Sequence, residues 1–248
     1  MKKAIIAIVF IIAFLFTSRL SFFTPSPLGL FTFSEPLFLF SALLLGPIYG
    51  ALVGGVGFAL SSFLLGYPHY IMAALIVNSI TGFIVGWINQ TKKFNYPILS
   101  AISTLILVAS FTVVGATIYS GEAYIGYTKN LFLGEGIMES GGLYAYHLDI
   151  PQWFWIIAGA FVGSAAFIVF KKHPKHLWAS SALLGGCLTL ILGYFLYESL
   201  FMPTFFNKKV NAATNLIVNF DHSIISSTIA LLTYWAIKFA RRNEHHEN

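Results

Sequence analysis

Charged side chains are scarce in this sequence. They make up 9% of the 248 residues, whereas hydrophobic residues make up 57%, and soluble domains typically contain about 25% charged residues. A soluble protein of this size exposes much of its surface to water and has too little interior to hide so many apolar side chains. We therefore expect an integral membrane protein with a single transmembrane domain over residues 1–248, because no long polar stretch provides a second domain.

Cysteine and catalytic motifs are also missing. Cys187 is the single cysteine, which excludes a disulfide framework and a thiolate metal cluster. The sequence has no phosphate-binding loop of the Walker type, so the chain does not hydrolyse ATP by itself, and it has no HExxH or GxSxG motif. The basic residues are dispersed in short groups, which does not favour nucleic-acid binding. We expect no enzymatic activity, no metal and no cofactor.

Eight apolar runs predict an all-α, polytopic helix bundle with about eight transmembrane helices. A spanning helix needs roughly 20 apolar residues, although shorter spans with somewhat fewer also occur. The predicted helices cover residues 4–18, 35–46, 48–66, 69–89, 96–119, 152–170, 177–200 and 211–239. The second and third are the least regular, because Pro47 interrupts the helical hydrogen-bond ladder between them. A single broken hairpin is the alternative for this pair.

The basic residues predict the orientation of the bundle. With the N-terminus in the cytoplasm and alternating spans, ten basic residues fall inside and four outside. The inner group is Lys2, Lys3, Lys92, Lys93, Lys171, Lys172, Lys175, Lys238, Arg241 and Arg242, and the outer group is Arg19, Lys129, Lys208 and Lys209. Cytoplasmic segments carry an excess of Lys and Arg, so we expect a cell-membrane protein with both termini in the cytoplasm.

Two long segments fall on the outer side of this topology. Residues 19–34 contain Thr24-Pro25-Ser26-Pro27-Leu28-Gly29, which predicts an ordered, turn-rich loop. Residues 120–150 are rich in Gly and Tyr and carry more acidic than basic residues. Loops of that length in compact proteins are usually functional or disordered, and the aromatic content favours a packed cap on the outer surface.

Glycines recur at four-residue spacing in several predicted helices. Gly46, Gly50 and Gly54 form one such series, and Gly82 with Gly86 forms another. Membrane helices associate through small residues that let their backbones approach closely. Two interpretations stay open, namely packing within the bundle and a docking surface for another membrane subunit.

Polar residues form a stripe along the last predicted helix. Asn211, Asn215, Asn219 and His222 follow at i, i+4, i+8 and i+11, which places them on one helical face. Amides both donate and accept hydrogen bonds, so the stripe suits a neutral, hydrogen-bonding small molecule. Interhelical hydrogen bonding without a ligand is the alternative. Asp221 lies beside the stripe, and ionisable groups at membrane depth are usually functional.

The fourth and seventh predicted helices add polar groups in the same outer half. Asn78 lies on the fourth helix, and Tyr194 and Glu198 share a face at i and i+4 on the seventh. An interfacial aromatic belt is the alternative interpretation for the tyrosines. Glu35 opens the second predicted helix, where its negative charge could simply favour the helix N-terminus. Together these residues predict a substrate-binding pocket that opens outward, lined by Asn78, Tyr194, Glu198, Asn215, Asn219 and His222.

The order of these features resembles the substrate-binding S components of energy-coupling-factor (ECF) vitamin transporters. The resemblance rests on Gly46-Pro47-Ile48-Tyr49-Gly50 between the second and third helices and on Gly82–Gly86 in the fourth. It continues in GYFLYESLF (residues 193–201) and in the last helix with its asparagines and basic end. It covers residues 1–90 and 180–242. S components usually have six helices, so residues 95–172 are expected to be an inserted helix pair with the outer loop 120–150.

The resemblance implies a mechanism and partners. An S component captures a micronutrient at the outer face, docks on a membrane T component carried by two cytoplasmic ATPases, and topples to release the substrate inside. Its first helix usually docks through small residues four apart. Here Ala4 and Ala7 are present without an Ala-x-x-x-Ala pair, so the ridge at Gly46, Gly50 and Gly54 is expected to share that role. The metal-ion branch begins Met-His, whereas this chain begins Met1-Lys2, which disfavours cobalt and nickel.

Two other classes of function remain as alternatives. A stand-alone, proton-driven secondary transporter would use Asp221, Glu198 and His222 as a relay and would be expected to show an inverted repeat, which the sequence does not reveal. A membrane-embedded enzyme or assembly factor would need a reactive constellation, and none is evident. The leading hypothesis is a substrate-capture subunit for a vitamin-like molecule in the lipid bilayer.

Overall fold

The computed structural model describes residues 2–24, 29–91, 97–127, 145–208 and 210–243. Each of the eight predicted helices has a counterpart among them. The long helices are α1 (Lys2–Thr17), α2 (Ser34–Leu45), α3 (Pro47–Leu64), α4 (Ile71–Gln90), α5 (Pro97–Ile118), α6 (Gln152–Lys172), α7 (Trp178–Leu196) and α9 (Ala212–Asn243). Short elements extend two of them. The element η1 (Pro68–Tyr70) precedes α4, and η3 (Pro174–Leu177), the π-helical η4 (Tyr197–Phe201) and α8 (Met202–Phe206) flank α7.

Six helical stretches in the described residues are long and apolar enough to cross a membrane. They are Pro47–Leu64, Pro68–Gln90, Pro97–Ile118, Gln152–Lys172, Pro174–Phe206 and Ala212–Ala240. Helices α1 and α2 have 16 and 12 residues, which is short of the roughly 20 that a perpendicular span requires. The helical bundle is therefore confirmed, and the number of eight spans stays a prediction.

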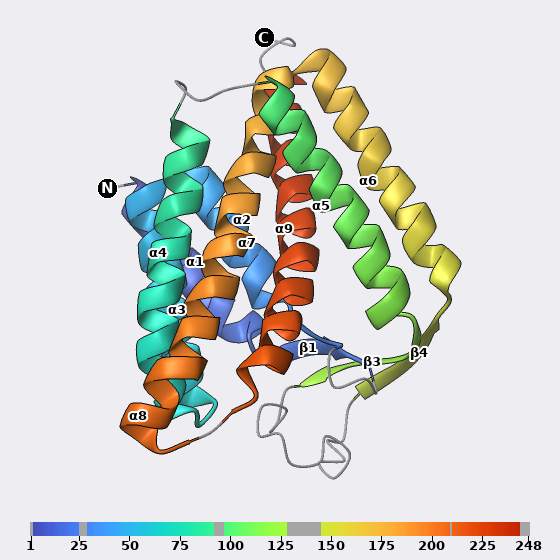
Figure 1. Cartoon of the computed structure of the whole chain (residues 1–248). Coiled ribbons are helices and arrows are strands. Elements are labelled where there is room, and N and C mark those ends of the chain that lie inside the picture. Colours follow the sequence, from blue (N-terminus) through green and yellow to red (C-terminus); the bar gives the residue numbers. More distant parts are fainter. Residues whose placement is uncertain (1, 25–28, 92–96, 128–144, 209, 244–248) are drawn as a thin grey trace.

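The two outer segments form a small antiparallel sheet that the all-α prediction did not contain. Strands β1 (Leu20–Phe23), β2 (Leu30–Thr32), β3 (Gly121–Tyr127) and β4 (Ala145–Ile150) pair in the order β2-β1-β3-β4. Across the β1–β3 pair, the rings of Phe23 and Tyr124 stack with their centroids 5.3 Å apart. The sheet lies at one end of the bundle (Figure 1). Most of the predicted loop at 120–150, residues 128–144, lies outside the described residues.

Hydrogen bonds between helices tie together the end of the bundle opposite to the sheet. Lys3 Nζ donates to the Leu45 carbonyl at 3.3 Å, and Asn89 Nδ2 donates to the Leu43 carbonyl at 2.8 Å. The Trp178 indole N–H donates to the Ile88 carbonyl at 2.6 Å. The start of α1 and the end of α9 therefore share one end of the molecule, and the sheet and α8 lie at the other (Figure 1).

The glycine series packs α3 against α4 inside the bundle. A Cβ atom at Gly82 would lie 2.3 Å from the Gly50 carbonyl oxygen, and one at Gly86 would lie 2.4 Å from the Gly46 carbonyl carbon. A Cβ at Gly54 would meet the Phe38 ring at 2.3 Å. Only glycine permits this backbone approach. Gly46, Gly50 and Gly54 are all buried within the chain, which favours packing inside the bundle, and their expected partner-docking role stays a prediction.

Helices α5 and α6 form a hairpin on the flank of the bundle (Figure 1). A Cβ at Gly115 of α5 would meet the Trp155 ring of α6 at 2.3 Å, and the Trp155 indole donates to the Tyr119 carbonyl at 3.1 Å. Helix α5 also bonds to α7, since Thr104 Oγ1 donates to Ser180 Oγ at 2.8 Å. This hairpin is thus packed on the rest of the helices through α5.

The α3–α4 contact predicts a sharp difference between two glycine substitutions. We expect Gly82→Ala to lower the melting temperature by several degrees, because the added methyl group overlaps the α3 backbone and overpacking costs about 1–3 kcal/mol. Gly163→Ala on α6 is the matched control, since its Cβ meets nothing closer than Val108 at 3.8 Å. Thermal unfolding of both variants in detergent measures the effect. Equal melting temperatures would contradict the tight contact.

Candidate functional site

Polar side chains gather between α2, α4, α7 and α9 at the end of the bundle that carries the sheet. On the α4 side, Asn78 Nδ2 donates to Tyr194 Oη of α7 at 2.8 Å and to the Ala74 carbonyl at 3.0 Å. One turn further out, Tyr70 Oη donates to Glu198 Oε1 at 3.0 Å. Tyr194 of α7 and Glu198 of η4 lie four residues apart and so share a face, which contacts Asn78 of α4 and Tyr70 of η1 along one seam.

Glu198 lies where α7 changes into the π-helical segment η4. Residues Tyr197–Phe201 adopt this wider helix, and π-helical turns are rare and occur often at functional sites. Tyr197 and Glu198 are both buried there, and Tyr197 Oη donates to the His69 carbonyl. The local unwinding therefore turns one phenol and one carboxyl group toward the start of α4.

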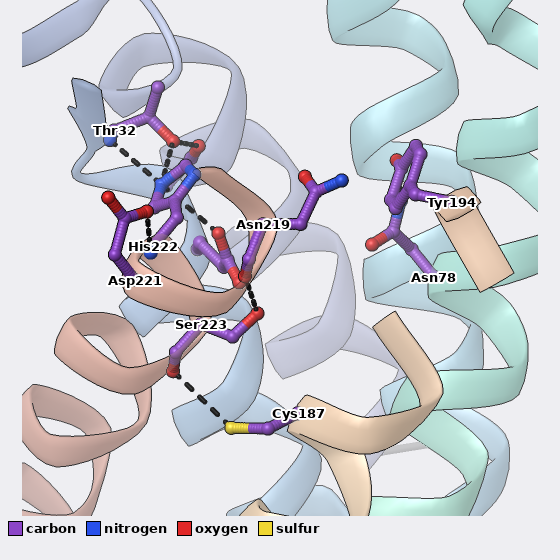
Figure 2. Close-up of polar contacts among 10 residues, drawn as sticks. Thr32, Asn78, Cys187, Tyr194, Asn219, Asp221, His222 and Ser223 are labelled. Atoms are coloured by element: carbon purple, nitrogen blue, oxygen red, sulfur yellow. Dashed lines mark hydrogen bonds and ion pairs between the residues drawn. The ribbon is translucent and has the colours of Figure 1, made fainter. Parts of the chain in front are cut away.

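On the opposite side, His222 of α9 joins the sheet to α2. The main-chain N–H of Thr32 in β2 lies 3.0 Å from His222 Nε2, and Glu35 Oε2 of α2 lies 3.1 Å from the same nitrogen. Figure 2 shows the imidazole between Thr32 and the residues of α9. A ring nitrogen carries either a hydrogen or a lone pair. His222 Nε2 therefore either donates to Glu35 or accepts from Thr32. In either state it holds one of the two elements, α2 or β2, to α9.

Asp221 lies next to His222 and is fully buried. Its Oδ1 atom accepts the His222 main-chain N–H at 2.6 Å. Below it, Cys187 of α7 approaches α9, with Sγ 3.1 Å from Ser227 Oγ and 3.5 Å from the Ser223 carbonyl. Cys187 is thus a buried contact between α7 and α9.

The two sides face each other across the site. Figure 2 shows the Asn219 side chain of α9 extended toward Asn78 and Tyr194, and it makes no side-chain hydrogen bond to another described residue. Glu35 lies within electrostatic range of Tyr194 and Asp221, and Asn215 lies close to Glu198. The α4–α7 group and the α2–α9 group therefore belong to one polar site.

Three buried polar atoms of this site have no hydrogen-bond partner. They are Asn78 Oδ1, Glu198 Oε2 and Asp221 Oδ2, and their side chains are 0%, 3% and 0% exposed. Buried polar atoms in native proteins are nearly always paired, with protein, water or ligand. Asn78 Oδ1 on α4 and Glu198 Oε2 on η4 lie on one side of the site, which indicates that a bound molecule completes the site there. Asp221 lies two residues from Asn219 and thus on another face of α9, within electrostatic range of Tyr119, and Ser226 Oγ and Ser100 Oγ are also buried without a partner among the described residues.

Comparison with known proteins agrees with this arrangement. The family model described as the S component of the ECF-type riboflavin transporter matches residues 1–139, which is more than half of the chain. The chain belongs to this family. It is a multi-pass membrane protein of the ECF S components, which are substrate-binding subunits of transporters.

One curated relative extends the comparison. It is an uncharacterized protein of Pyrococcus woesei that is 28% identical over 123 residues, or 48% of this chain and 82% of that protein. No solved structure matches the chain. The matched residues 1–139 of this S component reach across α5 into the segment that was expected to be inserted, so the boundaries of an inserted pair at 95–172 stay a prediction.

The six predicted binding residues of this S component all lie at the site. Asn78, Tyr194 and Glu198 line its α4–α7 side, and Asn215, Asn219 and His222 lie on α9. Sequence reasoning underestimated Glu35, which was interpreted as a helix-start residue although it pairs with His222. It missed Thr32 altogether, because nothing in residues 19–34 indicated a strand. In the described residues, no three His, Cys, Asp or Glu side chains converge as a metal site.

The His222 contacts predict a specific effect on the sheet. We expect His222→Ala to lower the melting temperature and to speed amide exchange at Thr32, because Nε2 no longer tethers β2 or the buried Glu35 to α9. Breaking a buried ion pair typically costs about 3–5 kcal/mol. Hydrogen exchange with mass spectrometry on residues 29–33 measures this.

The control is His147→Ala on β4, an exposed histidine of the same sheet, which should leave both readouts unchanged. A double variant, His222→Leu with Glu35→Leu, removes both polar groups together and should be more stable than His222→Ala. Unaltered exchange at Thr32 in His222→Ala would contradict the tether.

Proposed function

We propose that this S component is the substrate-capture subunit of an ECF-type importer and binds a vitamin-like small molecule at its outer face. The observation that carries the proposal is the pair of unpaired, buried polar atoms Asn78 Oδ1 on α4 and Glu198 Oε2 on η4, opposite the Asn219 amide, which makes no side-chain hydrogen bond to another described residue. Such a site has the composition of a small-molecule pocket, in which a few convergent polar groups orient the ligand within apolar walls.

Riboflavin is the first substrate to test, because it is named in the description of the matching family. Its ring system presents N–H and carbonyl groups, and its side chain presents hydroxyls. Asn78, Asn219 and the buried carboxyl groups offer matching partners. The aromatic ring of Tyr194 adds an apolar surface of the kind on which a planar heterocycle packs.

An outward-facing site follows from the orientation that the basic residues favour. Lys2, Lys3, Lys171, Lys172, Lys175 and Lys238 all belong to the end of the bundle opposite to the sheet. With that end in the cytoplasm, both termini are cytoplasmic and the polar site lies in the outer half. The sheet then covers the outer end of α9, where Thr32 contacts His222.

Uptake requires an energy source from outside this chain, which the T component and two cytoplasmic ATPases of an ECF complex would supply. Docking through α1 is part of the proposal. Ala7 is buried against Leu45 and Val53, whereas Ala4 is half-buried. The face of α1 that carries Ile5, Ile8 and Ile12 is exposed, so this face, rather than Ala7, is available to a T component.

The alternative of a proton-driven secondary transporter finds less support. Its relay would run through Glu198, Asp221 and His222. The described hydrogen bonds connect Glu198 to Tyr70 of η1. The His222 ring bonds to Thr32, and the His222 main-chain N–H donates to Asp221. No described hydrogen bond joins Glu198 to the other two, so the three residues do not form a continuous path for a proton.

The site predicts that one asparagine affects binding without affecting stability. We expect Asn219→Ala to weaken riboflavin binding about tenfold, the equivalent of one lost hydrogen bond, with an unchanged melting temperature because this side chain makes no internal hydrogen bond. Titration of the purified chain by flavin fluorescence measures the affinity. The control for affinity is Asn211→Ala, an exposed residue whose Oδ1 accepts the Thr214 N–H at the start of the same helix, so its melting temperature should fall while its riboflavin affinity stays unchanged. Wild-type affinity in Asn219→Ala would place the ligand elsewhere.

The energy source separates the two transport hypotheses. We expect cells that express this chain to accumulate radiolabelled riboflavin only together with a T component and two active ATPases, and we expect binding to the isolated chain to need neither. A protonophore should leave initial uptake unchanged while cellular ATP is maintained. Uptake by the chain alone that a protonophore abolishes would support the secondary transporter instead.

A further inference from the structure

Lysines gather at one corner of the end opposite to the sheet, where α6 passes into α7 (Figure 1). Lys171 and Lys172 lie in the last turn of α6, and Lys175 lies in the short connecting helix η3. All three side chains are exposed. The connection therefore concentrates positive charge in the short range 171–175, which we call the basic corner.

The basic corner has a fixed geometry because η3 packs on α9. The Trp235 indole N–H of α9 donates to the His176 carbonyl at 3.1 Å. The ring centroids of His173 and Phe239 lie 5.2 Å apart, and the His176 main-chain N–H donates to the His173 carbonyl at 2.9 Å. The three lysines therefore belong to an ordered turn, which binds a ligand at a lower cost in conformational entropy than a loose loop does.

Tryptophans place the basic corner at the depth of a membrane interface. Trp87, in the last turn of α4, is 49% exposed, and tryptophan is enriched where the bilayer meets water. Trp178 follows η3 directly and donates its indole N–H to the Ile88 carbonyl of α4, so the end of α4 and the basic corner lie at one level. The lysines are thus at the depth of lipid headgroups.

An apolar surface of α6 leads into the basic corner. Phe167 and Phe170 are 56% and 48% exposed, and Lys171 Nζ lies 4.6 Å from the centroid of the Phe167 ring. A lysine stem that covers apolar surface while its ammonium group stays at the polar boundary is typical of a membrane interface. The corner thus joins positive charge to a surface that suits an acyl chain.

The charges of the three lysines have no acidic counterpart in the part of the chain that the structure describes. The described acidic residues all belong to the sheet end of the bundle, in the strands or around the polar site, namely Glu35, Glu122, Asp149, Glu198 and Asp221. Residues 241–248 contain two arginines and two glutamates, so this tail adds no net charge. Uncompensated lysines at headgroup depth attract anionic lipid.

We propose that the basic corner binds the anionic headgroup of a phospholipid, with one acyl chain against Phe167 and Phe170 of α6. Ammonium groups bind phosphate as point charges, and the adjoining apolar surface has a use only if the anion carries a chain. In the orientation proposed above, this lipid belongs to the cytoplasmic leaflet, whose surface potential is negative. The inference does not depend on the capture function, because the polar site lies at the opposite end of the bundle.

Competition between two lipids with identical acyl chains tests the proposal. The purified full-length chain is placed in nanodiscs that contain an equimolar mixture of phosphatidylglycerol and phosphatidylcholine. Native mass spectrometry then counts the lipids that stay bound after transfer to detergent. We expect phosphatidylglycerol to be retained at least about tenfold over phosphatidylcholine. High salt should reduce this preference, because it screens exposed charges.

Paired lysine substitutions locate the site. Lys172→Gln with Lys175→Gln should reduce the preference to about twofold or less, whereas Lys172→Arg with Lys175→Arg keeps the charges and should retain it. The matched control is Lys2→Gln with Lys208→Gln, which removes the same charge from two exposed lysines away from the corner. Melting temperatures in phosphatidylcholine alone check that the variants are folded, and Lys175→Gln alone serves if the double variant is not.

Three outcomes would overturn the inference. Equal retention of the two lipids by the unaltered chain would mean that it does not select an anionic headgroup. An equal loss of preference in the corner variant and in the control would indicate attraction to the overall positive charge of the protein. A preference that inorganic phosphate abolishes, while chloride at the same ionic strength does not, would assign the lysines to a free anion.

Discussion

A polar atom buried in a bundle that lipid surrounds needs a partner, because the bilayer core offers no water to replace it. Most of the interhelical contacts of this protein follow from that constraint. At the basic end, Lys3, Asn89 and Trp178 each donate to a main-chain carbonyl of a neighbouring helix. At the opposite end, His222 serves Thr32 and Glu35. The same constraint makes the unpaired oxygens of Asn78 and Glu198 informative, since both lie on the α4–α7 side of the site.

The glycine contact between α3 and α4 determines where that region lies. Because Gly50 and Gly82 let the two backbones touch, α4 is held at a fixed rotation, and Asn78 points toward α7 and α9 rather than toward lipid. Glycine and amide residues therefore act at two levels. The glycines set the distance between helices, and Asn78, one turn from Gly82 on α4, uses the orientation that results. The π-helical turn at Glu198 then adjusts α7 locally.

A capture subunit that lacks an ATPase motif depends on partners for uptake, and this dependence agrees with the chemistry of the site. The described hydrogen bonds form two networks, α4 with α7 and η4, and α9 with α2 and β2, and Asn215 of α9 lies close to Glu198 where the two meet. A ligand between them would contact both networks. The sheet is joined to α9 through the contact of Thr32 with His222, so the outer strands are held to a helix that carries part of the site.

The amino-acid sequence by itself determined the class of this protein, the positions of its helices and the face of α9 that carries Asn215, Asn219 and His222. These properties depend on local hydropathy and on the helical period, which a linear pattern contains. Asn78, Tyr194 and Glu198 were also found, since polar residues in apolar helices are conspicuous. The tertiary structure alone decided that Gly46, Gly50 and Gly54 are internal, that residues 20–23 pair with residues 124–127, and that Glu35 meets His222. Each of these is a contact between segments far apart in the chain, and their pairing depends on three-dimensional packing that no local pattern encodes.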